Sequence, residues 1–119
     1  MSQIFIIEDD ADFASCLARY VSSESVEPLI FNNAISAISA LTSPLPSLIF
    51  LDILLTGPDG FTFLNELISY TDTAKIPVVI ISSLDLSAYD LSIYGVIGTL
   101  NKDNLTPKEV KSYVKRYTS

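Results

Sequence analysis

The run LIFLD at residues 48–52 constrains the fold more than any other stretch of this sequence. Four consecutive apolar residues are typical of a strand that is covered on both faces, as the strands of parallel sheets are. Asp52 therefore stands where a buried strand reaches solvent, held rigidly and still accessible. Taken alone, an aspartate at this place more often ends a strand at a turn than performs chemistry.

A second acidic cluster follows an equivalent apolar run near the start of the chain. Residues 4–7 are Ile-Phe-Ile-Ile, and Glu8, Asp9 and Asp10 come directly after them. If the two runs are neighbouring parallel strands, their carboxyl ends open on the same edge of the sheet, so Glu8, Asp9 and Asp52 converge. Carboxylates this close repel one another unless a cation lies among them or some of them are protonated. Mg²⁺ is a suitable cation, because it prefers oxygen ligands. The pattern predicts an acidic pocket for a divalent metal.

Length and composition limit the classes of protein. We expect residues 1–119 to form a single domain with its own core. A net charge of −7 without a basic stripe argues against nucleic-acid binding. No apolar run approaches the roughly 18 residues needed to cross a bilayer, and the start of the chain lacks the features of a signal peptide, so we expect no membrane association. The single cysteine, Cys16, favours simple packing and a reducing, cytoplasmic location.

The sequence contains no histidine. This absence excludes a Ser-His-Asp or Cys-His catalytic site and any zinc site that needs histidine. It also means that the chain cannot itself carry a phosphohistidine.

Strand and helix signals alternate along the chain. Strands are expected at 4–7, 29–31, 48–52, 78–81 and 96–100, and helices at 11–23, 34–41, 61–69, 85–94 and from 107 onward. The clearest start signal is a capping box, with Thr106 as the cap and Glu109 three residues later. Because crossovers between parallel strands are right-handed, the alternation predicts a parallel sheet with helices on both faces.

Two further polar groups are expected at the acidic edge of this sheet. Ser82 and Ser83 follow the strand at 78–81, and strand alternation favours Ser82 as the hydroxyl that faces the acids. Lys102 follows the strand at 96–100. An aspartate beside a metal ion, a hydroxyl and a lysine provides a carboxylate nucleophile and three groups that neutralise phosphoryl oxygens. These residue types predict that the site accepts a phosphoryl group.

Four segments in order resemble the receiver domain of two-component response regulators, and the likeness covers essentially the whole chain. They are residues 7–10, 51–53, 77–82 and 100–102. The resemblance implies an α/β, flavodoxin-like fold: a doubly wound, five-stranded parallel sheet of order 2-1-3-4-5 with five helices. It also implies a signalling domain that is not an enzyme, apart from self-catalysed phosphotransfer and slow autodephosphorylation.

The resemblance further implies a phosphoacceptor and a metal site. Asp52 would take a phosphoryl group from the phosphohistidine of a sensor histidine kinase or a histidine phosphotransfer protein. Asp9, Asp52 and the backbone carbonyl of Leu54 would bind Mg²⁺ or Mn²⁺, and Glu8 would act mostly through water.

Ser82 and Lys102 would contact the phosphoryl oxygens. The resemblance implies that phosphorylation then alters a partner surface on the helix at 85–94, the strand at 96–100 and the last helix. The resemblance also implies a possible homodimer through the faces of these two helices. The downstream partner would be a protein.

Three positions depart from the family pattern. Thr99 occupies the switch position three residues before the lysine, where the family usually has an aromatic side chain whose rotamer reports phosphorylation. Asp103 follows the lysine where proline is usual, so we expect a trans bond, because a cis bond before a non-proline residue costs about 3 kcal/mol. Thr56 stands where the loop after the phosphoacceptor commonly has proline. Thr99 and Asp103 leave open an alternative: a receiver-like interaction module whose output does not depend on phosphorylation.

A third possible function, besides the phosphorylated switch and the interaction module, is that of a flavin-binding protein or a haloacid-type phosphatase on a similar fold. A flavodoxin needs a hydroxyl- and glycine-rich phosphate loop after its first strand, and three acids there would repel the phosphate. A haloacid-type phosphatase would need a second aspartate two residues beyond the nucleophile, where Leu54 stands. Both are therefore disfavoured.

Overall fold

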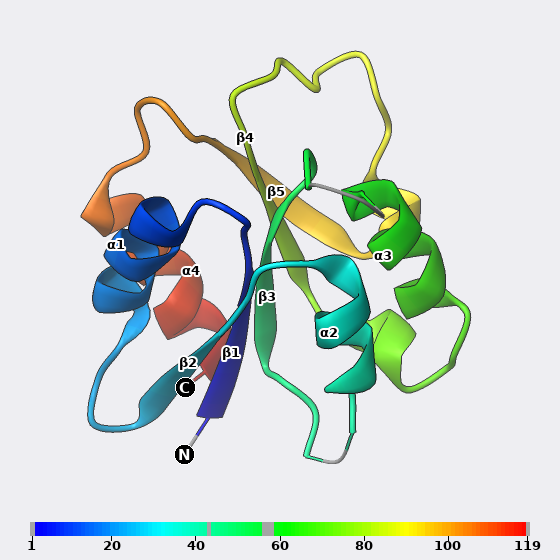
Figure 1. Cartoon of the computed structure of the whole chain (residues 1–119), viewed down its shortest axis with the longest axis horizontal. Helices are drawn as coiled ribbons and strands as arrows, with labels where there is room; N and C mark the ends of the chain where they lie inside the picture. Colours follow the sequence, from blue (N-terminus) through cyan, green and yellow to red (C-terminus); the bar gives the residue numbers. More distant parts are fainter. Residues whose placement is uncertain (1, 43, 56–58, 119) are drawn as a thin grey trace.

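The computed structural model of the protein describes residues 2–42, 44–55 and 59–118. Its strands form one sheet in the order β2-β1-β3-β4-β5, and every neighbouring pair is parallel (Figure 1). The strands are β1 (Ser2–Ile7), β2 (Val26–Phe31), β3 (Leu48–Asp52), β4 (Val78–Ser82) and β5 (Val96–Asn101). The flavodoxin-like strand order implied by the family resemblance is therefore confirmed.

Helices cover both faces of the sheet. They are α1 (Ala11–Val21), α2 (Ala34–Ser39), α3 (Gly60–Ile68) and α4 (Pro107–Thr118), together with the short 3₁₀ helices η1 (Thr73–Lys75) and η2 (Ser92–Tyr94). Helices α1 and α4 lie against one face, and α2 and α3 lie against the other (Figure 1). The alternation of strand and helix signals predicted this layering.

Side-chain caps fix the starts of the α-helices, including the predicted capping box at Thr106. The Asp10 side chain accepts hydrogen bonds from two backbone N–H groups of α1, and Asn33 and Asp59 each accept one at the starts of α2 and α3. At α4, the Glu109 N–H donates to Thr106 Oγ1 at 3.2 Å and the Thr106 N–H donates to Glu109 Oε1 at 2.9 Å. Each cap contributes about 1 kcal/mol, and each fixes where the chain leaves the preceding loop.

The three central strands are buried on both faces. Alternation along β3 and β4 sends Leu51 and Ile80 toward α2 and α3, and Phe50 and Val79 toward α1 and α4. All four side chains have at most 1% of their surface exposed. Full burial of such a side chain contributes about 1.5–3 kcal/mol. The two cores hold the strand ends, and hence the polar groups beyond them, in fixed positions.

The prediction of an α-helix at 85–94 is wrong. In this segment only η2 is helical, so the fold has four α-helices in its described residues rather than five. The Asp85 side chain accepts a hydrogen bond from the Ser87 N–H at 2.9 Å, and Asp90 accepts one from the Ser92 N–H at 3.1 Å. Such local bonds offer the backbone an alternative to the helical pattern, and aspartate and serine are weak helix formers.

Several element boundaries also differ from the prediction by one to three residues. Strand β2 begins at Val26, three residues before the predicted strand, and includes Pro28. It is an edge strand, as the proline indicated, and proline is tolerated there because one side of the strand has no ladder to donate into. Helix α1 ends at Val21, two residues earlier than predicted.

Two glycines permit close contacts between elements. A Cβ atom on Gly60 would lie 2.7 Å from Ile53 Cα and 3.1 Å from the carbonyl oxygen of Asp52. A Cβ atom on Gly98 of β5 would collide with the hydroxyl of Tyr113, whose ring comes from α4. Gly60 therefore lets α3 start directly against the end of β3, and Gly98 lets α4 approach β5.

We expect Gly60→Ala to lower the free energy of unfolding by about 1–3 kcal/mol, because the added methyl overpacks a contact between two backbones. Urea denaturation of the variant and of Asn65→Ala, an exposed position on the same helix, measures the difference. A loss at Gly60→Ala no larger than at Asn65→Ala would contradict the close packing of α3 on β3.

Candidate functional site

Three carboxylates meet at the carboxyl ends of β1 and β3. One oxygen from each of Glu8, Asp9 and Asp52 lies within 4.8 Å of the others. Glu8 and Asp52 are buried, and Asp9 is exposed. The convergence predicted from two separate stretches of sequence is present because β1 and β3 are neighbours in the sheet.

The carboxylate of Asp52 is held at both oxygens. Its Oδ1 accepts a hydrogen bond from the backbone N–H of Leu54 at 3.0 Å, and its Oδ2 lies 3.5 Å from Lys102 Nζ. With 5% of its surface exposed, Asp52 remains at the rim of the buried sheet. The side chain is therefore fixed in orientation.

Lys102 reaches the acids from the loop after β5. Its Nζ lies 2.6 Å from Glu8 Oε1, and its backbone N–H donates to the carbonyl oxygen of Ser82 at 3.0 Å. Burial acts to lower the pKa of Lys102, but the hydrogen bonds and charges of Glu8 and Asp52 outweigh it and raise the pKa above its ordinary value. The ammonium group thus stays charged and supplies the cation that balances the acids.

Phe13 of α1 supports this lysine. The Lys102 ammonium lies 4.9 Å from the centroid of the Phe13 ring, within cation–π range. In the sequence Phe13 looked like an ordinary apolar residue of an amphipathic helix. Only its place on the first turn of α1, directly after the acidic cluster, could have indicated a contact with the site.

The surroundings of Glu8 change its pKa. Burial raises the pKa of Glu8 from 4.5 to about 7, although Lys102 and the Asp10 N–H act to lower it, and the nearby Asp52 adds to the rise. Glu8 Oε2 accepts a hydrogen bond from the Asp10 N–H at 3.1 Å. Glu8 Oε1 pairs with the Lys102 ammonium but accepts no well-aligned hydrogen bond from the described residues.

The donor set fits a hard divalent cation. All three converging side chains are carboxylates, which are ligands that Mg²⁺ prefers, and the buried Oε1 of Glu8 accepts no well-aligned hydrogen bond from the described residues. A divalent ion would also offset the negative charge that Asp52 places beside Glu8. The residues present therefore suit Mg²⁺ or a similar ion.

The two serines after β4 face different ways. Ser82 is buried, and its Oγ accepts a hydrogen bond from the Leu84 N–H at 3.0 Å. Ser83 is exposed, and its Oγ donates to Asp103 Oδ1 at 3.4 Å. Ser82 is therefore the buried serine of the pair, and the orientation of its hydroxyl toward the acids stays a prediction.

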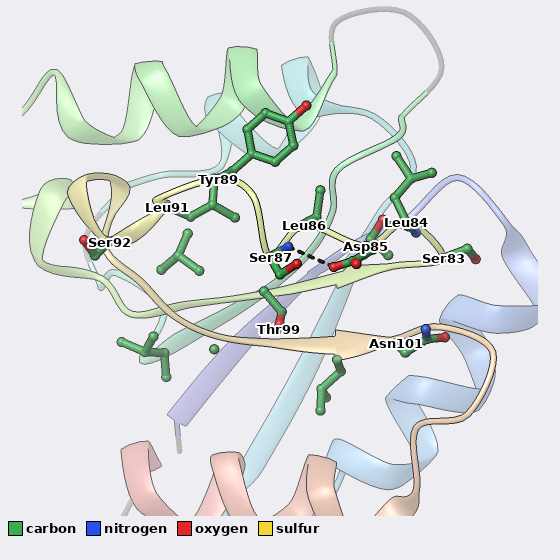
Figure 2. Close-up of a pocket in the computed structure, with 15 residues that line it drawn as sticks. Ser83, Leu84, Asp85, Leu86, Ser87, Tyr89, Leu91, Ser92, Thr99 and Asn101 are labelled. Atoms are coloured by element: carbon green, nitrogen blue, oxygen red, sulfur yellow. Dashed lines mark hydrogen bonds between the residues drawn. The ribbon is translucent and has the colours of Figure 1, made fainter.

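Thr99 lies exposed on β5 and lines a groove of about 810 Å³ between β5 and the segment that follows β4. Figure 2 shows Thr99 on this strand below Ser87, with Asn101 further along it. The groove occupies the region where the helix at 85–94 was expected. Thr56 lies outside the described residues.

Two apolar side chains flank the acidic pocket on adjacent loops. Leu54 follows Asp52 by two residues and is 55% exposed, and Leu84 follows Ser82 by two residues and is 50% exposed. Their backbone N–H groups donate to Asp52 Oδ1 and to Ser82 Oγ, so both leucines stand next to polar groups at the strand ends.

Comparison with known proteins identifies the family. The model of the response regulator receiver domain matches residues 4–115. The chain belongs to this family. Receiver domains are signalling domains of two-component systems rather than enzymes.

Individual relatives agree with this assignment. The transcriptional regulatory protein RstA of Escherichia coli is 31% identical over 71% of this chain, and the match spans 34% of RstA, so the chain corresponds to about a third of that regulator. A putative response regulator from Chloroflexus aurantiacus has the same fold, with a TM-score of 0.84, 23% identity and coverage of 98% of this chain and 97% of that one. The Mn(2+)-bound form of response regulator Rcp1 is 25% identical, with a TM-score of 0.74 and coverage of 98% and 91%.

The helices of the described residues include none that is long and apolar enough to span a membrane.

The raised pKa of Glu8 gives the stability of the protein a defined pH dependence. A folded carboxyl that titrates near pH 7 holds a proton that its unfolded counterpart loses near pH 4.5, so its contribution to stability is complete below pH 4.5 and is lost as the pH rises to about 7. The free energy of unfolding of Glu8→Gln lacks this loss. In buffer without divalent ions, we therefore expect the free energy of unfolding of Glu8→Gln, relative to that of the wild type, to increase by about 1–3 kcal/mol between pH 5 and pH 7.5.

Urea denaturation of both proteins at the two pH values measures this gain. Glu24→Gln, which changes an exposed acid far from the site, controls for the general effect of removing a charge. Equal pH dependence in the wild type and Glu8→Gln would show that Glu8 titrates normally.

Proposed function

We propose that this domain is the phosphoacceptor switch of a two-component phosphorelay, with Asp52 as the phosphoacceptor. The observation that carries the proposal is the meeting of Glu8, Asp9 and Asp52 beside a lysine, with Lys102 Nζ 3.5 Å from Asp52 Oδ2. Membership of the receiver family supports the same function.

Asp9, Asp52 and the backbone carbonyl of Leu54 would hold Mg²⁺ or Mn²⁺, with Glu8 acting through water. The carboxylate cluster and the Mn(2+)-bound form of the related regulator Rcp1 support this assignment. When bound, the ion would neutralise the oxygens of the incoming phosphoryl group.

The residues of the chain have separate roles in the transfer. An oxygen of Asp52 forms a bond to phosphorus while the bond from phosphorus to the donor histidine nitrogen breaks, and that imidazole keeps the electron pair and takes up a proton. The Leu54 N–H fixes the orientation of the Asp52 carboxylate before the attack. Lys102 and the Ser82 hydroxyl donate to the phosphoryl oxygens in the product.

The donor would be a sensor histidine kinase or a histidine phosphotransfer protein, because the chain has no histidine of its own. The output surface would comprise the segment after β4, strand β5 and α4, and would bind a downstream protein or a second copy. The expected helix at 85–94 is no longer part of this surface, since only η2 forms there.

A second candidate function is an interaction module whose output does not depend on phosphorylation. The observation that favours it is the exposed Thr99, which provides no aromatic side chain to couple the site to the groove. The two functions differ in whether a change at Asp52 reaches the segment that borders this groove.

Incubation with acetyl phosphate and Mg²⁺ tests the proposed function. We expect the intact mass to increase by one phosphoryl group, the increase to require Mg²⁺, and Asp52→Ala to abolish it while Asp59→Ala, a nearby cap residue, leaves it intact. No modification of the wild type, or modification that persists in Asp52→Ala, would contradict the assignment of Asp52. A modified protein whose backbone amide NMR signals in residues 83–101 do not shift would favour the interaction module.

The exposed Leu54 and Leu84 predict a long-lived phosphoryl group. Bulky apolar side chains at the open side of the site hinder the in-line approach of water, so we expect Leu54→Asn to accelerate loss of the phosphoryl group by about tenfold, or about 1.4 kcal/mol in the barrier. Decay of the phosphorylated mass after removal of the donor gives the rate. Leu54→Met, which keeps an apolar side chain of similar size, should decay like the wild type; a wild-type lifetime of seconds that neither substitution changes would contradict the prediction.

A further inference from the structure

Strand β5 forms an edge of the sheet that is unlike the opposite edge. Among the described residues β5 pairs only with β4. Its sequence, VIGTLN, contains no charged residue and no proline, and Ile97 is 38% exposed. The opposite edge strand, β2, carries Glu27 and Pro28. Charges, prolines and β-bulges are the usual means by which edge strands avoid pairing with other chains. Strand β2 has a charge and a proline, whereas β5 has neither and carries one register shift, at Ile97.

The hydrogen bonds of the ladder show which groups of β5 are free. The Lys102 N–H donates to the carbonyl oxygen of Ser82, so Lys102 and Leu100, two residues earlier, point their backbone groups toward β4. The N–H and C=O groups of Thr99 and Asn101 therefore point away from the sheet. The Asn101 carbonyl already accepts from the Leu105 N–H at 2.9 Å, whereas no bond outside the ladder involves Thr99 in the described residues.

The free edge is also accessible. Thr99 and Asn101 are exposed, and the segment after β4 leaves the groove of about 810 Å³ beside the strand instead of a helix packed along it. Figure 2 shows β5 in front of β4, with this segment above it and α4 below. The register of the β4–β5 ladder shifts between Val78 and Val79 of β4, opposite Ile97 of β5, and the pairing from Gly98 to Asn101 is regular.

We propose that β5 pairs antiparallel with β5 of a second copy of this chain, about a two-fold axis at Thr99. The Thr99 N–H of each copy would donate to the Thr99 carbonyl of the other, which satisfies the groups that the monomer leaves unpaired. Ile97 of one copy would lie beside Asn101 of the other. The two sheets would become one continuous sheet.

The choice of a second copy follows from charge and symmetry. A two-fold axis at Thr99 places no charged side chain opposite its own copy, because β5 has none, although each chain carries a net charge of −7. Pairing of β5 with β2 of another copy would meet Pro28, which has no N–H, and would produce open chains instead of a closed dimer. Cross-strand threonine pairs are favourable in antiparallel sheets. The proposal does not require phosphorylation of Asp52.

Sedimentation velocity of the 119-residue chain over a range of concentrations tests the proposal. A single pair of strands buries little surface, so we expect a dissociation constant on the order of 10–100 µM. Thr99→Pro removes the outward N–H without removing a bond to β4 and should weaken the dimer at least tenfold, whereas Thr99→Val keeps the N–H and should dimerise like the wild type. Ile97→Lys places a charge on the edge and should also weaken the dimer.

Amide hydrogen exchange locates the contact independently. The Thr99 amide should exchange rapidly in dilute protein and more slowly as the concentration rises, while the Lys102 amide, bonded to Ser82 in the monomer, should not change. A wild type that stays monomeric to about 1 mM would overturn the proposal. So would a dimer that survives both Thr99→Pro and Ile97→Lys, or one that Arg116→Glu on α4 disrupts while those substitutions do not.

Asp52→Ala separates this proposal from the proposed function. We expect Asp52→Ala to dimerise like the wild type while it fails to accept a phosphoryl group. Loss of the dimer in this variant would overturn the proposal of pairing at the β5 edge and would leave the assignment of Asp52 unchanged.

Discussion

Repulsion among three carboxylates is the constraint on which the site depends. Parallel strands β1 and β3 bring Glu8, Asp9 and Asp52 within 4.8 Å of one another, at the edge of a buried sheet where water screens them poorly. Two features of the site limit this cost. The Lys102 ammonium lies 2.6 Å from Glu8 and 3.5 Å from Asp52, and Glu8, mainly because it is buried, holds its proton to a higher pH than an ordinary glutamate. Both features reduce the negative charge of the cluster.

The sequence predicted those parts of the structure that strong local patterns specify. Unbroken apolar runs located the central strands, and the capping box at Thr106 located the start of the last helix. Convergence of the acids followed from one general rule, that the carboxyl ends of parallel strands share an edge. The strand order needed the family resemblance, because the residues alone do not state which strands are neighbours.

The errors fall where tertiary contacts or weak local preferences decide. The segment at 85–94 has apolar residues at spacings compatible with a helix, but side-chain bonds at Asp85 and Asp90 compete with the helical pattern. The sequence alone does not show whether the helix or the local side-chain bonds prevail, because the outcome depends on tertiary contacts with neighbouring elements. Phe13 was missed for a related reason: its contact with Lys102 joins the first helix to the last loop, and no local signal marks it.

Gly98 and Tyr113 have a consequence for how this domain could have diverged. The Tyr113 ring occupies the space that a side chain at 98 would need, so Gly98 can be replaced only if the tyrosine moves or gives way to a smaller residue. Tyr113 is not constrained in the same way, because a smaller residue there meets no clash with Gly98. Mutational routes that enlarge position 98 therefore pass more readily through position 113 first.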